Sequence, residues 1–115
     1  MKRPKSLSVV WTPSAIQDLD RIADSISVDS PQGALDACDR LERRAASLNS
    51  LSERGRVVPE LSAHGVMTYR ELIVAPWRLI YRVEDKRFVV LGFFDGRRNL
   101  EDLLLERLLA EPEDD

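Results

Sequence analysis

The residues best suited to chemistry in this sequence are arginines that recur along an apolar stretch between positions 69 and 98. A guanidinium group carries five N–H donors in a planar fork and binds phosphate or carboxylate oxygens two at a time. Tyr81 lies in the same stretch and could stack on a nucleic-acid base or move a proton. Such a set could bind a phosphate group or an acidic protein segment, or could simply keep an exposed face soluble. The arginines that we consider candidate ligands are Arg70, Arg78, Arg82, Arg97 and Arg98.

Catalysis at such a site would need a general base and a general acid beside the arginines. Asp95 precedes Gly96-Arg97-Arg98 but is a poor base, Lys86 lies in a polar turn, and His64 lies in a loop beside Gly65. One histidine and one cysteine cannot supply four zinc ligands, and the sequence has no Walker-type, GxGxxG or GxSxG motif. These absences favour binding over catalysis, with no metal and no cofactor.

Length and composition predict a single domain over residues 1–110, followed by an acidic tail at 111–115. Residues 53–98 carry nine Lys and Arg against six Asp and Glu, whereas residues 99–115 carry one against seven. A lone cysteine, Cys38, favours a reducing compartment, and no apolar run approaches the roughly 18 residues that a membrane span needs. We therefore expect a cytoplasmic protein without membrane contact.

The first half of the sequence predicts a strand over residues 7–11 and two amphipathic helices. Thr12-Pro13 and Ser30-Pro31 each combine an N-cap hydroxyl with a proline at the first helical position. Short spacing predicts an antiparallel helical hairpin. In the first helix, the residues expected to face the core are Ile16, Leu19, Ile22, Ala23 and Ile26, and those expected to face water are Gln17, Asp18, Asp20, Arg21 and Asp24. In the second helix, the expected apolar stripe consists of Ala34, Leu35, Cys38, Leu41, Ala45 and Leu48.

Residues 49–65 predict a long connection anchored by Val57, Val58 and Leu61, and three strands follow it. Ala75-Pro76 and the turn at 84–86 are too short for anything but antiparallel neighbours. The second strand alternates apolar and charged residues from Trp77 to Glu84, whereas the third is apolar at nearly every position and should be central.

Asn99 should cap a final helix that carries more leucines than one buried stripe needs. We expect a partner protein or a second copy of the chain to cover part of this helix, including Leu104 and Leu108. The elements together predict an α+β fold, with a small antiparallel sheet in the order β-α-α-β-β-β-α and the helical hairpin packed on one face. The first strand should join the sheet at an edge or beside the central strand.

The segments GRVVPEL, YREL, WRLIYRVE and VVLGFFDGRRNLEDLL occur in the order found in the ParE branch of the RelE/ParE toxin superfamily, which this sequence resembles. The resemblance implies a toxin that inhibits DNA gyrase by binding. It also implies a ParD-like antitoxin that lays a segment across the toxin in a hetero-oligomer. Matching positions are Arg70, Trp77, Arg78, Tyr81 and Gly96-Arg97-Arg98, and Asp95 stands where many relatives have histidine.

Two alternatives remain open at this point. The chain could be a RelE-like, ribosome-dependent mRNA endoribonuclease, in which the arginines stabilise charge on the scissile phosphate. It could instead be an inactive toxin-fold module that retains only partner binding.

Overall fold

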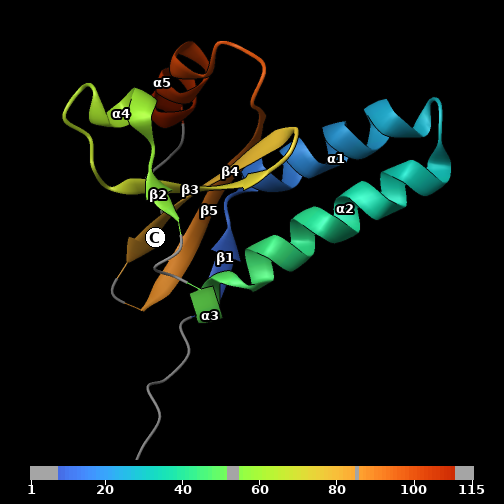
Figure 1. Cartoon of the computed structure of the whole chain (residues 1–115), viewed down its shortest axis with the longest axis horizontal. Coiled ribbons are helices and arrows are strands. Elements are labelled where there is room, and N and C mark those ends of the chain that lie inside the picture. Colours follow the sequence, from blue (N-terminus) through green and yellow to red (C-terminus); the bar gives the residue numbers. More distant parts are fainter. Residues whose placement is uncertain (1–7, 52–54, 85, 111–115) are drawn as a thin grey trace, which may run out of the picture.

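The computed structural model describes residues 8–51, 55–84 and 86–110, so Leu7 and the predicted acidic tail lie outside the described residues. The sheet is built from β1 (Ser8–Trp11), β2 (Arg56–Val57), β3 (Tyr69–Val74), β4 (Trp77–Glu84) and β5 (Arg87–Asp95). The helices are α1 (Pro13–Ser27), α2 (Pro31–Ala46), α3 (Leu48–Leu51), α4 (Pro59–Ser62) and α5 (Leu100–Ala110) (Figure 1). In the described ranges, every helix is too short or too polar to span a lipid bilayer.

The five strands form one sheet in the order β1-β5-β4-β3-β2, which confirms the predicted α+β class. β3, β4 and β5 are antiparallel neighbours, as the short turns predict. β1 lies at the edge beside β5 but runs parallel to it, pairing Ser8 with Arg87 and Trp11 with Val90. The sheet is therefore mixed, and the prediction of an antiparallel sheet is wrong for β1, because a long crossover through the helices and three strands, not a tight turn, joins β1 to β5.

The two long helices begin as predicted and form the hairpin that covers one face of the sheet (Figure 1). The Thr12 hydroxyl accepts a hydrogen bond from the Ala15 N–H at 3.1 Å, and the Ser30 hydroxyl accepts one from the Gly33 N–H at 2.9 Å. The hairpin extends beyond the sheet, which leaves Leu35 66% exposed rather than buried. Cys38 is half-buried, and this burial raises the pKa of its thiol.

The prediction of which α1 residues face the core is wrong at two positions. Asp18 is only 4% exposed and faces the sheet, whereas Ile16 is 51% exposed. The reason is that α1 crosses the end of β5, where an unpaired backbone N–H needs an acceptor. A carboxylate meets that need, which hydrophobic periodicity does not reveal.

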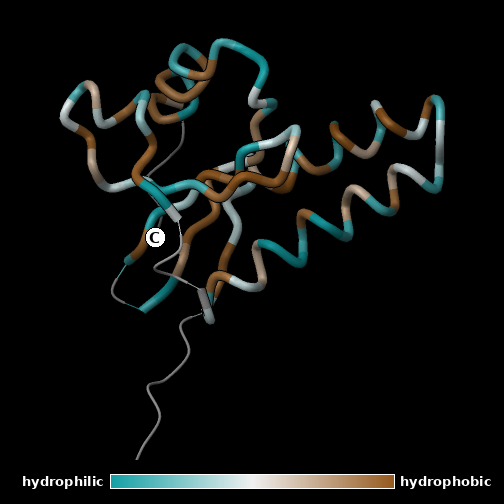
Figure 2. The backbone as a smooth tube through the Cα atoms, viewed as in Figure 1, coloured by the Kyte–Doolittle hydropathy of each residue, from teal (hydrophilic) through white to brown (hydrophobic). Residues whose placement is uncertain are grey.

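A separate apolar core lies on each face of the sheet, and apolar residues in Figure 2 concentrate along the strands and the facing sides of the helices. The core under the hairpin includes Leu41, Leu48, Leu79, Tyr81 and Phe88. The core under α4 and α5 includes Val58, Leu61, Ile80, Leu91 and Leu104. β5 contributes to both cores, which confirms that both of its faces are covered.

The connection predicted over residues 49–65 contains regular structure: α3, the two-residue β2 and α4. β2 extends the sheet by pairing Arg56 with Glu71 and Val57 with Arg70. Val58 and Leu61 are fully buried, so two of the three expected anchors are confirmed, while Val57 is half-buried. A strand of two residues is too short to produce a detectable alternation.

Candidate functional site

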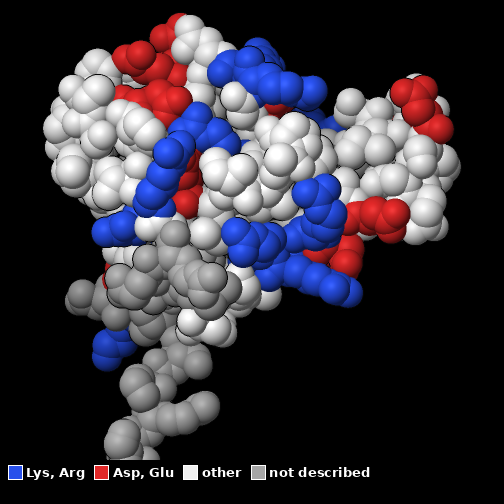
Figure 3. All heavy atoms as spheres, viewed as in Figure 1, with Lys and Arg blue, Asp and Glu red and all other residues white. Residues whose placement is uncertain are grey.

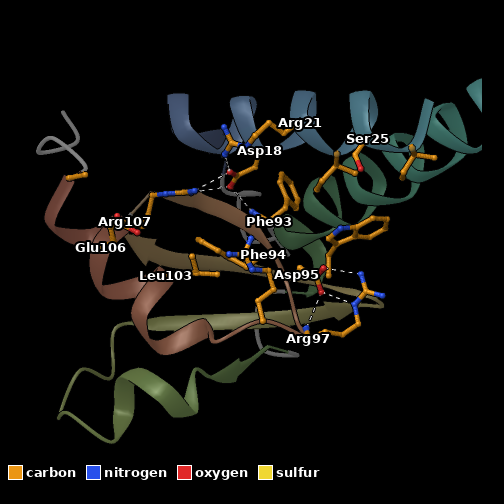
Figure 4. Close-up of a pocket in the computed structure, with 15 residues that line it drawn as sticks. Asp18, Arg21, Ser25, Phe93, Phe94, Asp95, Arg97, Leu103, Glu106 and Arg107 are labelled. Atoms are coloured by element: carbon orange, nitrogen blue, oxygen red, sulfur yellow. Dashed lines mark hydrogen bonds and ion pairs between the residues drawn. The ribbon is translucent and has the colours of Figure 1, made fainter. Parts of the chain in front are cut away.

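A cleft of about 610 Å³ runs along the end of β5 between α1 and α5 (Figure 4). Its apolar lining comes from all three elements and from β4: Ile22, Ile26, Trp77, Phe93, Phe94 and Leu103. Charged side chains also line it: Asp18, Arg21, Asp95, Arg97, Arg98, Glu106 and Arg107. The cleft thus offers apolar surface and charges of both signs to a partner.

The cleft exists because β1 is shorter than β5. β1 pairs only as far as Val90, and the chain then turns at Thr12 into α1. Side chains occupy the edge that β1 leaves open: the Thr12 hydroxyl donates to the Leu91 carbonyl at 3.1 Å, and the Phe93 N–H donates to Asp18 Oδ2 at 3.0 Å. Helices α1 and α5 therefore satisfy backbone groups that a neighbouring strand would otherwise pair.

Asp18 and Arg107 tie the walls of the cleft together. The guanidinium of Arg107 donates through Nη1 and Nη2 to the two carboxylate oxygens of Asp18, both at 2.9 Å, and Nη1 also donates to the Leu91 carbonyl at 3.1 Å. Arg107 also lies over the Phe94 ring, 4.7 Å from its centroid. A methyl group at Gly92 would overlap both Arg107 and Asp18, so the glycine in this apolar strand makes room for the ion pair.

At the other end of the cleft, Arg97 neutralises Asp95. The Arg97 backbone N–H and Nε both donate to Asp95 Oδ1 at 2.9 Å, and Nη2 donates to Oδ2 at 2.8 Å. These hydrogen bonds lower the pKa of Asp95 to about 2, so the carboxylate is ionised at neutral pH. Arg98 is exposed and makes no ion pair with any described residue, which leaves its guanidinium available to a partner.

Of the predicted site residues, the cleft brings together Trp77, Arg97 and Arg98. Arg78 instead lies in an ionic network on the α4 side of the sheet, where it donates to both Glu60 oxygens at 2.7 and 2.8 Å and to Glu71 at 2.6 Å. The hydrogen bonds to Glu60 are the main cause of a raised pKa for Arg78 and of a lowered pKa for Glu60.

Arg70 and Arg82 also lie outside the cleft. Arg70 donates to the Gly55 carbonyl at 2.9 Å and so holds the start of β2 against β3. Arg82 pairs with Glu84 at 2.8 Å near the far end of β4. Arg70 and Arg82 therefore contact other groups of the chain at places outside the cleft, and the arginines of the sheet do not form one continuous binding surface.

Two of the predicted partner contacts are wrong. Tyr81 and Leu104 are both fully buried, Tyr81 against Phe88 under the hairpin and Leu104 in the core beneath α5. Neither side chain can reach a partner in this fold. Leu108 is half-buried and remains a prediction.

Sequence patterns alone did not reveal Asp18, Phe93 and Arg107 as lining residues. The sequence offered only one weak signal for them: a glycine at position 92 interrupts an otherwise apolar strand, which indicates that other groups come close to the strand backbone there. Asp18 resembles any solvated helix residue in sequence, and only the short β1 explains why it faces inward.

His64 is not part of the cleft. Its Nε2 contacts Glu101 Oε2, joining the loop after α4 to the first turn of α5, and both side chains are about half exposed. Over residues 8–51, 55–84 and 86–110, no three His, Cys, Asp or Glu side chains lie together as a metal site would require.

The fold and cleft describe a small α+β domain with an open cleft beside a helical hairpin and the end of β5. A family model described as the ParE toxin of the type II toxin–antitoxin system parDE matches residues 9–100. The chain therefore belongs to the ParE toxin family within the RelE/ParE superfamily.

Named relatives agree with this assignment. The sequence is 41% identical over 78 residues to Toxin RelE2 of Caulobacter vibrioides, covering 67% of this chain and 81% of that protein. A structure of the chromosomal ParDE toxin–antitoxin system from P. aeruginosa is similar with a TM-score of 0.66 and 27% identity, covering 78% of this chain and 96% of the other. The toxin–antitoxin complex RelBE2 from Mycobacterium tuberculosis shares the fold, with a TM-score of 0.57 and 18% identity over 83% of this chain and 97% of the other.

Proposed function

We propose that this toxin acts by binding DNA gyrase, not by cutting RNA, and that a ParD-like antitoxin silences it. The observation that carries the proposal is the state of the titratable groups in and around the cleft. Asp95, which lines the cleft together with Arg98, is held ionised by Arg97, with a pKa of about 2. A group with so low a pKa is a weak proton acceptor at neutral pH.

Three other acids and bases, outside the cleft, are also engaged. Glu60 and Glu71 are hydrogen-bonded to Arg78, and His64 is paired with Glu101 outside the cleft. An RNA-cleaving site would need a proton acceptor and donor near a bound phosphate. The arrangement instead offers apolar surface with Arg98 on the rim, which suits recognition of a protein surface.

The antitoxin should cover the same cleft. Ile22, Ile26 and Trp77 are half-buried there, and a partner's apolar side chains could complete their burial. An antitoxin bound at this position would hide Arg98 and so prevent contact with the target. The complex would be a toxin–antitoxin hetero-oligomer in the cytoplasm.

Controlled expression in bacteria tests the proposal, with growth, DNA breakage and mRNA integrity followed together. We expect growth arrest with broken DNA and intact mRNA. Purified gyrase should show inhibition by the chain, and Arg98→Glu should weaken it at least tenfold. Lys86→Glu is the matched control, since it reverses an exposed charge in the β4–β5 turn, outside the cleft. Intact DNA with cleaved mRNA would overturn the proposal.

The alternative is a RelE-like endoribonuclease, and it is favoured by one observation: a relative 41% identical to this chain is named Toxin RelE2. In that case the mRNA should be cut at codons on the ribosome, and gyrase should be unaffected. The expression experiment separates the two functions directly.

A further inference from the structure

Most of the described arginines are neutralised by a carboxylate of the same chain. Those that form an ion pair with Asp or Glu are Arg21, Arg43, Arg56, Arg78, Arg82, Arg87, Arg97 and Arg107. Over residues 8–51, 55–84 and 86–110, the arginines without such a pair are Arg40, Arg44, Arg70 and Arg98. Arg40 and Arg44 differ from the other two, because they lie one helical turn apart on α2.

These two residues and Arg43 form one wall of a groove. The other wall is the end of β3, and the residues that line the groove of about 370 Å³ are Arg40, Arg43, Arg44, Ile73, Val74 and Ala75. Basic side chains gather over α2 in the space-filling view (Figure 3). Ile73 is 52% exposed, so a ligand in the groove would meet one apolar side chain beside three guanidinium groups.

The chain itself does not balance this positive charge. Asp39 pairs with Arg43 at 3.0 Å, but no described carboxylate pairs with Arg40 or Arg44. Like charges four positions apart on a helix repel each other. The helix dipole favours cations in the last turn, which holds Arg43 and Arg44 but not Arg40. The cluster therefore costs free energy in the isolated chain, and an anionic ligand would offset that cost.

Arg40 is held in place before any ligand binds. Its Nη2 donates to the Ala75 carbonyl at 2.9 Å, and its guanidinium lies 6.0 Å from the centre of the Trp77 ring. A guanidinium has five N–H donors, so this hydrogen bond leaves the others for a ligand. Arg44 is half-buried, and its side chain has no partner among the described residues. Ordering of side chains is one of the costs of binding, and a guanidinium that is already held reduces it.

We propose that this groove binds the phosphate backbone of duplex DNA without reading its sequence. Residues four positions apart on an α-helix are separated by about 6 Å along its axis. This separation is close to that of successive phosphates on one nucleic-acid strand, so Arg40 and Arg44 can each bind one of two neighbouring phosphates. Guanidinium groups bind phosphate oxygens through paired N–H donors, and such contacts carry no sequence information.

Two features favour duplex DNA over other anionic ligands. Sites for single strands provide aromatic side chains on which unpaired bases stack, and none of the described residues that line the groove is aromatic. A nucleic-acid strand also supplies one phosphate per nucleotide at a constant interval, whereas the carboxylates of an acidic peptide follow its sequence. The proposal goes beyond gyrase inhibition and antitoxin binding, because different residues line this groove and the β5 cleft.

The test is a titration of a fluorescently labelled duplex of about 20 base pairs with the purified full chain, without gyrase, at salt concentrations from about 50 to 200 mM. Fluorescence anisotropy reports binding. We expect the logarithm of the affinity to fall linearly with the logarithm of the salt concentration, with a slope of about −2 to −3, since each neutralised phosphate contributes about −0.9.

Variants of one arginine locate the contact. Arg44→Gln should weaken binding at least threefold at the lowest salt concentration and reduce the magnitude of the slope by about one. Arg44→Lys keeps the charge and should retain the slope. Lys86→Gln is the matched control, because it removes one exposed positive charge in the β4–β5 turn, and it should leave binding unchanged. Far-UV circular dichroism verifies that each variant is folded.

Several results would overturn the proposal. An absence of binding at the lowest salt concentration, or an affinity independent of salt, would exclude phosphate contacts. Equal weakening by Arg44→Gln and Lys86→Gln would indicate attraction by net charge alone. Tighter binding of a single strand of equal length, with the same dependence on Arg44, would assign the groove to unpaired nucleic acid. Displacement of the duplex by an equal concentration of a polyglutamate peptide of the same charge would assign it to an acidic protein segment.

Discussion

The two faces of the sheet are held by different interactions. Under the helical hairpin, Leu41, Tyr81 and Phe88 form an apolar core. On the other face, the half beneath α5 is apolar, but the half nearer β3 depends on ion pairs centred on Glu71 and Arg78. Apolar packing fixes the hairpin on the sheet, whereas the short β2–α4 segment combines two fully buried side chains, Val58 and Leu61, with ion pairs made by Arg56 and Glu60. The following predictions test that difference.

The largest effect should come from Glu71→Ala. Glu71 is 2% exposed and accepts hydrogen bonds from Arg78 and Arg56, so its removal leaves Arg78 with only Glu60 as an acceptor. Breaking a buried pair from one side costs about 3 to 5 kcal/mol. Urea unfolding measures the loss, and the double variant with Arg78→Met should recover part of it. A loss under about 1 kcal/mol would show that the ion pairs contribute little to this face.

Leu104→Ala should cost about 3 kcal/mol, because it opens a cavity in the core beneath α5. Leu109→Ala removes the same atoms from a side chain that is 88% exposed, so it should change the free energy of unfolding by less than about 0.5 kcal/mol. The difference between the two variants measures how much the apolar core beneath α5 contributes to the free energy of unfolding. Equal losses would contradict the burial difference between the two leucines.

Asp18→Asn should have a smaller effect, about 2 kcal/mol, since the amide can still accept from the Phe93 N–H but cannot pair with Arg107 as an ion. Amide hydrogen exchange at Phe93 and along α5 should become faster. Asp20→Asn is the matched control, because Asp20 is exposed on the same helix. Unchanged exchange along α5 would show that Arg107 does not hold this helix in place.

The smallest effect on stability concerns Asp95, whose pKa is lowered to about 2 by Arg97. A lowered carboxyl pKa stabilises the fold above the unfolded value of 3.8 and loses that contribution as pH falls toward 2. Arg97→Ala should therefore raise the pKa of Asp95 toward 3.8, as measured by NMR titration of its side chain. A pKa near 3.8 in the parent protein would show that Arg97 is free to meet a partner.

Much of the fold was predictable because its signals are local. Thr12-Pro13 and Ser30-Pro31 indicate the starts of both long helices, and the short turns after Val74 and Glu84 require antiparallel neighbours. The parallel pairing of β1 and the inclusion of β2 depend on contacts between distant segments, which no local pattern specifies. The candidate site was only partly predictable for the same reason.

Trp77, Arg97 and Arg98 lie in motifs and were predicted, but Asp18 and Arg107 are 89 positions apart and meet only in the folded chain. Alternation correctly placed Tyr81 on the apolar face of β4, and full burial excludes the partner contact proposed for it. Counting leucines could not show whether Leu104 is buried in the chain's own core or covered by a partner, because α5 is apolar around much of its circumference.

The parallel pairing of β1 with β5 also constrains when the protein can fold. Ser8 pairs with Arg87, and the Thr12 N–H bonds the Val90 carbonyl at 3.1 Å, so the sheet joins residues separated by nearly the whole domain. Contacts so distant in sequence slow folding, because a long loop must close before they form. During synthesis, β1 and the hairpin leave the ribosome long before β5 exists. The toxin fold, and with it any toxic activity, therefore arises only after translation has passed β5, which gives an antitoxin already present in the cell time to meet it.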